Sequence, residues 1–461
     1  MPTPSSYDPA RFKPRTFFDA VPAFRSGQDD PCQYLERCLE VIAEREPTVQ
    51  AWVIMNERGA REAADASARR WREGRPLSPI DGMPIGIKDL IETKDMPTQM
   101  GCAAFEGHFP KSDSASVRAL RDAGAIILGK LVTTELAAGL AGPTTNPFNP
   151  LHTPGSSSSG PAAAVGAGMI PVAIGTQVGG SVIRPASYCA NWALKPTLGA
   201  LNRGERLTYS HGTLGIHGGS LQDIWPVAIA MSQRAGGDPG RPGLFGPPDT
   251  PLAAKPQRLI LMETGGWADL DKITREALEQ VLAQLQNAGV EIVRRTDSAL
   301  LDVFEQRIAS MNAVGNDITA FELRPLLENL VEAQPDKISP RLLQKLEQGR
   351  KLTLDDYRAR LLACEEARHR FTAIAPLGDA LISVSSSGPA PLGTLAGTHP
   401  AATTVFNAPA SMLGAPAVTV PLLAIGGLPV GVQLVGQQHA DAGMIGMARW
   451  LGDNIPHVIR Q

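Results

Sequence analysis

One stretch of the 461-residue chain constrains its fold more than any other. Residues 155–160 read Gly-Ser-Ser-Ser-Ser-Gly, residues 179–181 read Gly-Gly-Ser, and no charged residue stands between them. On composition alone, four serines between two glycines are typical of a flexible linker. A linker should have polar neighbours, however, and the segment that joins these two motifs is rich in Ala and Gly. The stretch therefore predicts closely packed backbone in which the serines hold fixed positions.

Composition excludes several classes of protein. Hydrophobic residues make up 43% of the chain and charged residues 19%, which is enough apolar mass for a large core and excludes a disordered chain. The formal net charge of −3 gives no electrostatic footprint for nucleic acid or for an anionic membrane. The sequence also contains no signal-peptide pattern and no apolar run long enough for a membrane span. We therefore expect a cytoplasmic protein that binds neither nucleic acid nor membrane.

Cysteine and histidine patterns give no sign of metal or disulfide chemistry. The five cysteines are odd in number and scattered, with no C-x-x-C pair. The eight histidines form no H-E-x-x-H motif and no cluster with cysteine. We therefore expect reduced thiols, no metal site and no cofactor.

Strand and helix patterns alternate along most of the chain. The expected strands lie at 83–87, 125–128, 258–263, 290–293, 380–384 and 417–420. The expected helices lie at 33–46 and 60–73, between an N-cap at Ser112-Asp113 and Gly124, and at 273–285. Residues 300–377 instead contain several charged helical patterns, and the Gly- and Pro-rich residues 235–256 predict a surface loop. No internal repeat divides the chain, so we predict one large α/β domain over residues 1–461.

Both serine motifs have features of a catalytic site. Pro161 suits the first position of a helix, so the serine run would stand at a helix N-terminus, where backbone N–H groups favour negative charge. A nucleophilic serine also needs N–H donors for the developing oxyanion, and Gly179-Gly180 would let the backbone turn such donors inward. Taken singly, an ordinary Gly-Gly turn is the simpler interpretation. Neither motif is a G-x-S-x-G elbow, so an α/β-hydrolase triad is not indicated.

Taken in order, the motifs resemble those of the amidase signature family, the Ser–cisSer–Lys hydrolases. The shared pattern is an apolar strand ending in Lys-Asp, a Gly-Ser-rich loop and a Gly-Gly-Ser turn, here at 84–89, 154–158 and 179–181. Further matches lie at 129–130, 146–147, 194–197 and 428–434. The resemblance implies the family's fold, a central mixed β-sheet covered by helices on both faces. It also implies a catalytic core at 80–230, with 300–377 as a helical cover over the active site.

The resemblance places the nucleophile at Ser181, the bridging serine at Ser157 and the terminal base at Lys88. Ser158 is the alternative bridging residue, because the serine run also permits a register shifted by one position. In the family the bridging serine follows a cis peptide bond, so the bond between Ser156 and Ser157 is expected to be cis.

A lysine that acts as a base must be neutral, and burial among apolar groups favours the neutral form. Without the serine motifs, a surface Lys88 paired with Asp89 would be the simpler interpretation. In the implied mechanism Lys88 takes the proton of Ser181 through Ser157, and Ser181 attacks the carbonyl carbon. The oxyanion is then held by the backbone N–H groups of Val178, Gly179, Gly180 and Ser181. The implied supporting residues are Ser158, Thr176, Gln177 and Arg184.

Several positions depart from the family pattern. Gln177 stands where the family usually has Asp, which removes a charge beside the relay. Arg184 follows the nucleophile by three residues, whereas the family more often has its arginine two residues after. The usual Gly, Gly and Ser are replaced by Ser156, Ser159 and Pro161. None of these changes removes an expected catalytic group.

Three functions are compatible with these motifs. The first is a stand-alone amidase that hydrolyses a carboxamide, an anilide or a carbamate (urethane) bond, with esterase activity as a side reaction. The second is the glutaminase subunit of a tRNA-dependent amidotransferase, which needs a partner. The third is a catalytically inactive binding protein on the same fold, which the presence of Lys88, Ser157 and Ser181 argues against. The first implies a small-molecule substrate, no cofactor, and a monomer or homodimer.

Substrate choice depends on the acyl pocket, which we expect residues 201–217 and 300–330 to wall. Candidate linings are Met100, Leu136, Tyr209 and Met311, with an ordinary core position as the alternative for each. The two histidines at 211 and 217 are expected to have loop or packing roles. The balanced net charge predicts an uncharged carbonyl substrate, but the motifs do not distinguish among amides, anilides and carbamates.

Overall fold

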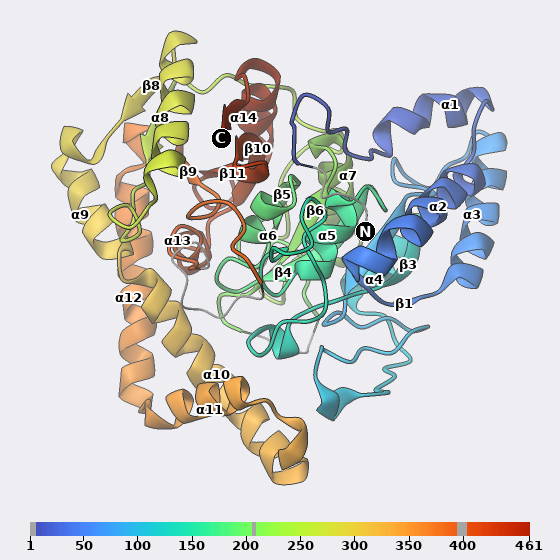
Figure 1. Cartoon of the computed structure of the whole chain (residues 1–461), viewed down its shortest axis with the longest axis horizontal. Helices are drawn as coiled ribbons and strands as arrows, with labels where there is room; N and C mark the ends of the chain where they lie inside the picture. Colours follow the sequence, from blue (N-terminus) through green and yellow to red (C-terminus); the bar gives the residue numbers. More distant parts are fainter. Residues whose placement is uncertain (1–5, 205–208, 394–402) are drawn as a thin grey trace.

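Twelve strands of the described chain form one mixed β-sheet (Figure 1). The computed structural model describes residues 6–204, 209–393 and 403–461. The strands are β1 (Trp52–Met55), β2 (Pro84–Lys88), β3 (Ile126–Leu131), β4 (Val172–Gln177), β5 (Trp192–Lys195), β6 (Thr213–Gly218), β7 (Arg258–Leu261), β8 (Glu291–Val293), β9 (Ala380–Val384), β10 (Ala417–Ile425), β11 (Leu428–Val435) and β12 (Val458–Arg460). Their order is β1-β3-β2-β4-β6-β5-β10-β11-β9-β7-β8, and β12 pairs with β10. The strands β3, β2 and β4 run parallel, as do β9, β7 and β8, whereas the pairs between these two groups are antiparallel.

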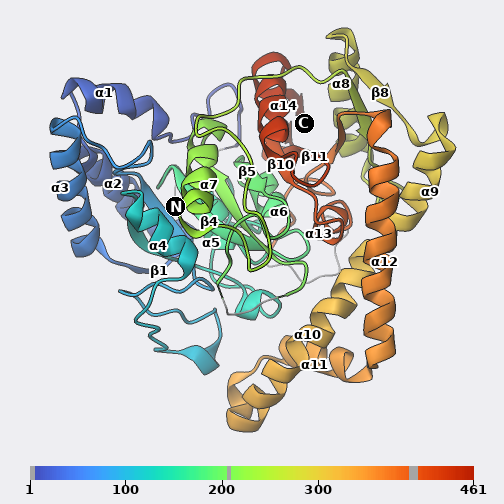
Figure 2. The ribbon, with the colours of Figure 1, turned by 180° about the vertical axis from the view of Figure 1, so that it is seen from behind.

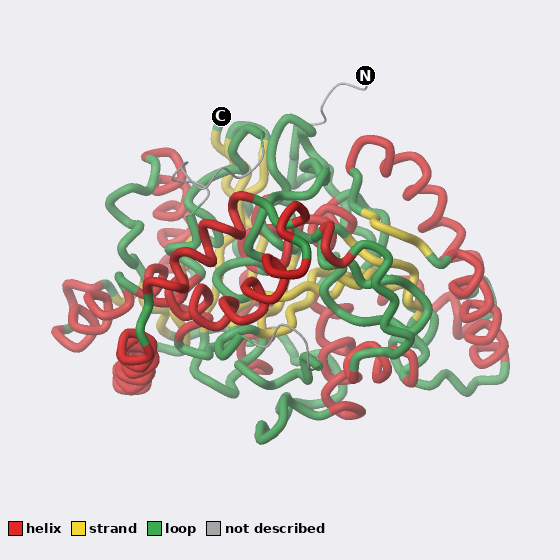
Figure 3. Tube along the Cα trace, turned by 90° about the horizontal axis from the view of Figure 1, so that it is seen from below, coloured by secondary structure: helices red, strands yellow, loops and turns green. Residues whose placement is uncertain are grey.

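Helices cover both faces of the sheet, as the resemblance implied (Figure 3). They are α1 (Val21–Ser26), α2 (Pro31–Val49), α3 (Glu57–Arg72), α4 (Ala115–Asp122), α5 (Ser159–Gly166), α6 (Ile183–Tyr188), α7 (Leu221–Ala235), α8 (Lys272–Asn287), α9 (Ala299–Ile308), α10 (Met311–Ala333), α11 (Pro340–Lys351), α12 (Leu354–Ala373), α13 (Ala408–Met412) and α14 (Asp441–Asn454). Successive strand residues point to opposite faces. Ile87 of β2 shares a core with Leu120 of α4 and Ile224 of α7, which lie side by side (Figure 2). On the other face, Leu128 of β3 shares a core with Leu35 of α2.

The expected elements are present, but some of their ends are shifted. The helix α4 begins after Ser114, whose Oγ accepts a hydrogen bond from the N–H of Val117 at 3.4 Å, and not after Ser112-Asp113 as predicted. The carboxylate of Asp113 is instead paired with Arg121 at 3.1 Å, so it is not available to cap the helix. Three polar residues in a row offered three possible caps, and contacts with the rest of the chain selected the last of them.

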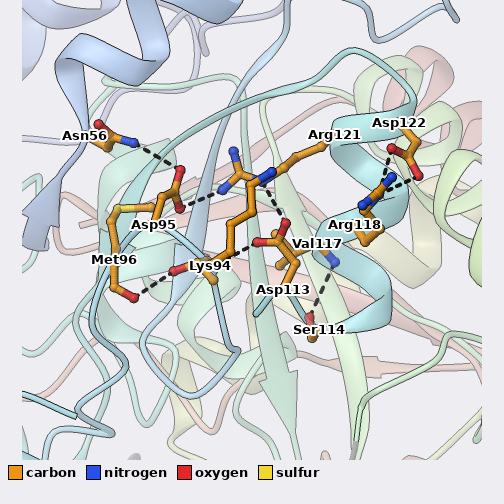
Figure 4. A network of polar contacts seen from close by, with 11 residues as sticks. Asn56, Lys94, Asp95, Met96, Asp113, Ser114, Val117, Arg118, Arg121 and Asp122 are labelled. Carbon is orange, nitrogen blue, oxygen red and sulfur yellow. Dashed lines mark hydrogen bonds and ion pairs between the residues drawn. The ribbon is translucent and has the colours of Figure 1, made fainter. Parts of the chain in front are cut away.

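A polar network holds the segment that follows β2 (Figure 4). Asp95 accepts a hydrogen bond from Nδ2 of Asn56, the N-cap residue of α3, at 3.0 Å and pairs with Arg121 of α4 at 2.7 Å. Asp113, the second partner of Arg121, accepts the backbone N–H of Lys94 at 2.9 Å. The segment is therefore fixed between α3 and α4, which steadies the carboxyl end of β2.

Residues 300–377 contain helices α9 to α12 and no strand, in agreement with the charged helical patterns of the sequence. The helices α10 and α11 come very close where Gly349 faces the backbone carbonyl of Ala320. A Cβ atom at Gly349 would lie 2.3 Å from that carbonyl oxygen, so only glycine permits this approach. Figure 1 shows α10 and α11 side by side at the lower edge of the molecule. Between α7 and β7, residues 236–257 contain no helix or strand, as predicted for the loop at 235–256.

Three further features concern membranes, thiols and metals. In the parts of the chain that the structure describes, the helices are all too short or too polar to cross a membrane. The five cysteines are free thiols. Within residues 6–204, 209–393 and 403–461, no group of three or more His, Cys, Asp or Glu side chains could hold a metal ion.

Candidate active site

The carboxyl ends of two parallel strands bring Lys88 and Thr176 together. The strand β2 ends at Lys88 and β4 ends at Gln177, and the two strands pair through Ile87 and Ile174. Parallel neighbours end at the same edge of a sheet, so the side chains at their ends converge there. The Nζ atom of Lys88 lies 2.8 Å from Oγ1 of Thr176. Thr176, expected as a supporting residue, is therefore in direct contact with the expected base.

The serine loop supplies the other contacts of Lys88. Its Nζ lies 2.8 Å from Oγ of Ser157 and 3.1 Å from Oγ of Ser158. The Ser158 hydroxyl is also bound to the backbone of Thr176, donating to the carbonyl at 3.1 Å and accepting from the N–H at 3.3 Å. Ser157 lines the large cavity beside Ser181, whereas Ser158 does not. Ser157 thus stands between the lysine and the cavity, while Ser158 braces the end of β4.

Glycines flank the serine loop because the backbone there leaves no room for a side chain. Gly155 has a φ of +124°, and a Cβ atom at this position would lie 2.6 Å from Cα of Pro185. At Gly160 a Cβ atom would lie 2.4 Å from the backbone nitrogen of Val132. The loop then enters α5, in which Pro161 is the third residue and not the first, as the sequence had suggested. These contacts identify the stretch as packed backbone and not as a linker.

Lys88 has no exposed surface. Burial lowers the pKa of its ammonium group well below the ordinary value. The neighbouring Asp89 pairs instead with Lys130, whose Nζ lies 3.0 Å from Oδ1 of the carboxylate. Lys88 is therefore a buried amine surrounded by hydroxyl groups, and not a surface lysine paired with Asp89. No carboxylate of the described chain forms an ion pair with it.

The hydroxyl of Ser181 is bound to a different serine from the one expected. Its Oγ lies 2.9 Å from Oγ of Ser156, and within the described residues no hydrogen bond joins it to Ser157. The peptide bond between Ser156 and Ser157 is trans, because the described chain contains no cis peptide bond, so the expected cis bond is not found in this structure. Lys88 and Ser157 are joined as expected, while the nucleophile is held by the serine that replaces a family glycine.

The turn before Ser181 offers backbone donors to the cavity. The N–H groups of Gly179, Gly180 and Ser181 donate to no other group among the described residues. A Cβ atom at Gly180 would lie 2.8 Å from Oδ1 of Asn407, so a side chain does not fit there. With Val178, these residues line the cavity, where such donors can stabilise a developing oxyanion.

Gln177 orders the turn that carries the nucleophile. Its Oε1 accepts hydrogen bonds from the N–H groups of Val182 at 2.9 Å and Ile183 at 3.1 Å. Its Nε2 donates to Oγ of Ser411 at 3.2 Å, and that hydroxyl donates to the carbonyl of Gly179 at 3.2 Å. A side-chain carbonyl thus accepts from the two N–H groups that follow the nucleophile without placing a charge beside the relay.

A cavity of about 560 Å³ opens onto Ser181. This volume is in the range of sites for small molecules. Both segments expected to wall the pocket contribute to it, through Tyr209 and His211 and through Asn312, Gly315, Asn316 and Thr319. Residues 205–208, which belong to the first of these segments, lie outside the described residues.

Of the four apolar candidates for the lining, only Tyr209 lines the cavity. Met100 and Leu136 pack with Tyr209 in a small core, and Met311 belongs to another core. His211 is buried in the cavity wall, where burial lowers its pKa to about 3. Its Nε2 lies 3.4 Å from Oγ1 of Thr319, which is a packing role.

Comparison with known proteins identifies the family. The Amidase family model matches residues 33–445. The chain belongs to the amidase signature family. Among the relatives of this family member, a glutamyl-tRNA(Gln) amidotransferase subunit from Chloroflexus aurantiacus is 30% identical, and the match covers 92% of this chain and 93% of the relative. The subunit of the same name from Myxococcus xanthus is 27% identical over 94% and 96% of the two chains.

Solved structures of amidase signature proteins have the same fold. A structure described as "Crystal structure of amidase" matches with a TM-score of 0.83 at 26% identity, and the match covers 95% of this chain and 100% of that one. A structure described in terms of a vestigial protein complex and the origins of an s-triazine catabolic enzyme also gives a TM-score of 0.83 at 26% identity, over 96% and 99% of the chains.

The amidase signature motifs do not account for one wall of the cavity. This wall is formed by α11, through Arg341, Gln344, Lys345 and Gln348. The sequence analysis assigned 300–377 a covering role but named no residue of α11. A signal was present, since the buried Leu342 and Leu346 recur every four residues and leave the polar residues for the other faces of the helix. The direction that those faces take depends on how α11 packs on α10, which no local pattern specifies.

Proposed function

We propose that the chain hydrolyses a carbon–nitrogen amide bond of a small molecule through an acyl-enzyme on Ser181. One observation carries the proposal: Lys88 is fully buried, and its Nζ lies 2.8 Å from Oγ of Ser157 at the edge of the cavity that Ser181 lines. A buried amine is largely neutral and can act as a base. Membership of a family of enzymes that hydrolyse carbon–nitrogen bonds supports the same conclusion.

In the proposed reaction the proton of Ser181 passes to Ser157 as that of Ser157 passes to Lys88, and Oγ of Ser181 attacks the carbonyl carbon. For this step Ser181 turns from Ser156 towards Ser157, a change between side-chain rotamers. The N–H groups of residues 178–181 stabilise the tetrahedral oxyanion. Ser157 then delivers a proton to the leaving nitrogen, the amine departs, and water hydrolyses the acyl-enzyme through the same relay.

The substrate of this reaction is a carboxamide, an anilide or a carbamate, the last of which would make the protein a urethanase. All three present a carbonyl group bonded to nitrogen, and the cavity of about 560 Å³ suits a small molecule. In this proposal residues 80–230 supply the chemistry and residues 300–377 cover the site. The protein would work in the cytoplasm as a monomer or homodimer and without a cofactor.

A second candidate function is the glutaminase subunit of a tRNA-dependent amidotransferase. It is favoured by the names of the relatives from Chloroflexus aurantiacus and Myxococcus xanthus. In that case the amide would be that of glutamine, and the ammonia released would be used by another subunit.

An assay of the purified chain alone separates the two functions. We expect hydrolysis of a p-nitroanilide or a p-nitrophenyl carbamate without any partner, and covalent labelling of Ser181 by a fluorophosphonate. Hydrolysis of glutamine only in the presence of the other amidotransferase subunits would support the second function instead. If no substrate is turned over and Ser181 is not labelled, neither enzyme function holds.

A further inference from the structure

Two cationic side chains of α11 line the wall of the active-site cavity. Arg341 and Lys345 are four residues apart, which places them on one face of the helix. Leu342 and Leu346 are buried, so they fix the helix against the rest of the protein. A third cation, Arg184 of α6, lines the same cavity and is itself buried.

These positive charges act on one another across the cavity. Burial lowers the pKa of Arg184, and the charge of Arg341 lowers it further. Burial also lowers the pKa of Lys345 to about 8, with Arg341 adding to the effect and Asp317 opposing it. Arg341 is therefore near enough to both side chains to repel their charges.

No acidic side chain of the described lining balances these charges. The described residues that line the cavity include no Asp and no Glu. Lys345 donates only to neutral acceptors, the carbonyl of Asn316 at 3.4 Å and Oε1 of Gln348 at 3.1 Å. Asp317, the nearby carboxylate, is paired with Arg360 at 2.9 Å. The cavity thus combines a nucleophilic serine with an excess of positive charge.

We propose that Arg341 and Lys345 of α11, together with Arg184, form a subsite for a carboxylate of the substrate. The preferred substrates are then amides, anilides or carbamates that carry an acidic group away from the bond that is cut. An arginine can bind a carboxylate through two N–H groups, and a lysine adds a point charge. This inference rests on the proposed function, because it concerns the substrate of the same cavity.

The subsite explains how a nearly neutral chain can select a charged substrate. The net charge of −3 is a sum over the whole surface, whereas the cavity collects side chains of one sign. The uncharged substrate that the balanced composition suggested is therefore replaced by an anionic one. A cavity with one sign of charge also raises the local concentration of ligands of the opposite sign.

Matched substrates test the proposal. In one pair the acid is on the acyl side: the mono-p-nitroanilide of glutaric acid against the p-nitroanilide of butyric acid. In the other pair it is on the amine side: 4-acetamidobenzoate against 4-acetamidotoluene. We expect kcat/KM for the acid to exceed that for the neutral partner by at least about tenfold in one pair, and less so at high salt.

Variants assign the preference to α11. In the double variant Arg341→Gln/Lys345→Gln the ratio of kcat/KM for acid over neutral substrate should fall about tenfold, mainly through KM. Lys351→Gln is the matched control, because Lys351 lies on the same helix but outside the cavity lining. Its ratio should equal that of the unmodified protein. The single variants Arg341→Gln and Lys345→Gln give the answer if the double variant does not fold.

Binding gives a readout that does not depend on turnover. Calorimetry with the Ser181→Ala variant should detect the acid of the preferred pair and weaker binding once Arg341 and Lys345 are also replaced by Gln. Equal turnover and equal binding of acid and neutral compounds would overturn the carboxylate subsite but leave the proposed function intact. Binding of the acid without any turnover by the unmodified protein would overturn the proposed function and leave the subsite intact. If the acids neither bind nor react, both are wrong.

Discussion

The Nζ atom of Lys88 lies 2.8 Å from Oγ of Ser157, at a place where the lysine has no contact with solvent. The carboxylate next to it in the sequence, that of Asp89, is paired with Lys130 at 3.0 Å. The amine therefore has hydroxyl groups as its neighbours and no acidic partner within the described chain. Its proton affinity is set by burial, which is the condition that a lysine base requires.

Removal of either end of the relay should abolish catalysis. We expect Lys88→Ala and Ser181→Ala each to lower kcat for amide hydrolysis by at least about 10³-fold, because residues of one catalytic unit fail together. Circular dichroism and thermal unfolding should show that both variants remain folded. An active Lys88→Ala enzyme at neutral pH would show that the relay is wrong.

Activity should fall as the pH falls. The base must be neutral, so kcat/KM declines when Lys88 becomes protonated below its lowered pKa. The acid limb of a pH–rate profile should fit a single ionisation well below the ordinary value of about 10.4 for lysine. Lys88→Arg is the control, since an arginine stays protonated and should be inactive at every pH tested. A flat profile between about pH 5 and 9 would contradict a lysine base.

The two serines that contact the relay should differ in their effect on rate. Ser157→Ala should lower kcat by about 10²–10⁴-fold, because it removes the group that passes the proton. Ser156→Ala removes only the hydrogen bond that holds Ser181 at 2.9 Å and should cost less than about tenfold. The measurement is kcat for one anilide with both variants. The reverse order would move the bridging role to Ser156, and a large loss only with Ser158→Ala would move it to Ser158.

A side chain at Gly180 should damage the oxyanion donors. The added Cβ atom of Gly180→Ala would lie 2.8 Å from Oδ1 of Asn407 and must displace the turn. We expect kcat to fall by about 10²–10³-fold, the effect of losing one such donor. Gly443→Ala is the matched control, since a Cβ atom there meets no atom within 4 Å. Equal activity of both variants would exclude this turn as the oxyanion site.

Gln177 should matter through its carbonyl oxygen. Gln177→Ala leaves the N–H groups of Val182 and Ile183 without their acceptor and loosens the turn that positions Ser181. We expect a loss of about 10–10² in kcat with little change in KM, because a small displacement of the nucleophile slows the reaction step. Gln177→Glu keeps an acceptor at the same reach and should lose less. An unchanged kcat in Gln177→Ala would show that the turn is rigid without it.

Features that are local in sequence were predictable, and features that depend on packing were not. The apolar run before Lys88 and the tight glycines at 155 and 160 specify a strand and a packed loop, and both are present. By contrast, Tyr209 and Met100 are equally apolar, yet only the first reaches the cavity. The partner of Ser181 depends on side-chain rotamers, which no motif encodes. The charge of the cavity likewise required the position of α11, because a net charge gives no spatial distribution.

The helical pair α10 and α11 has a consequence for how such a protein can acquire new substrates. The reacting groups come from residues 88–181, whereas α10 and α11, much later in the chain, supply a separate wall of the same cavity. Selection in the laboratory could therefore vary Asn312, Asn316, Arg341 and Lys345 without touching the proton relay. The limit on such libraries is Gly349, where any larger residue would push the two helices apart and open the cavity for every substrate alike.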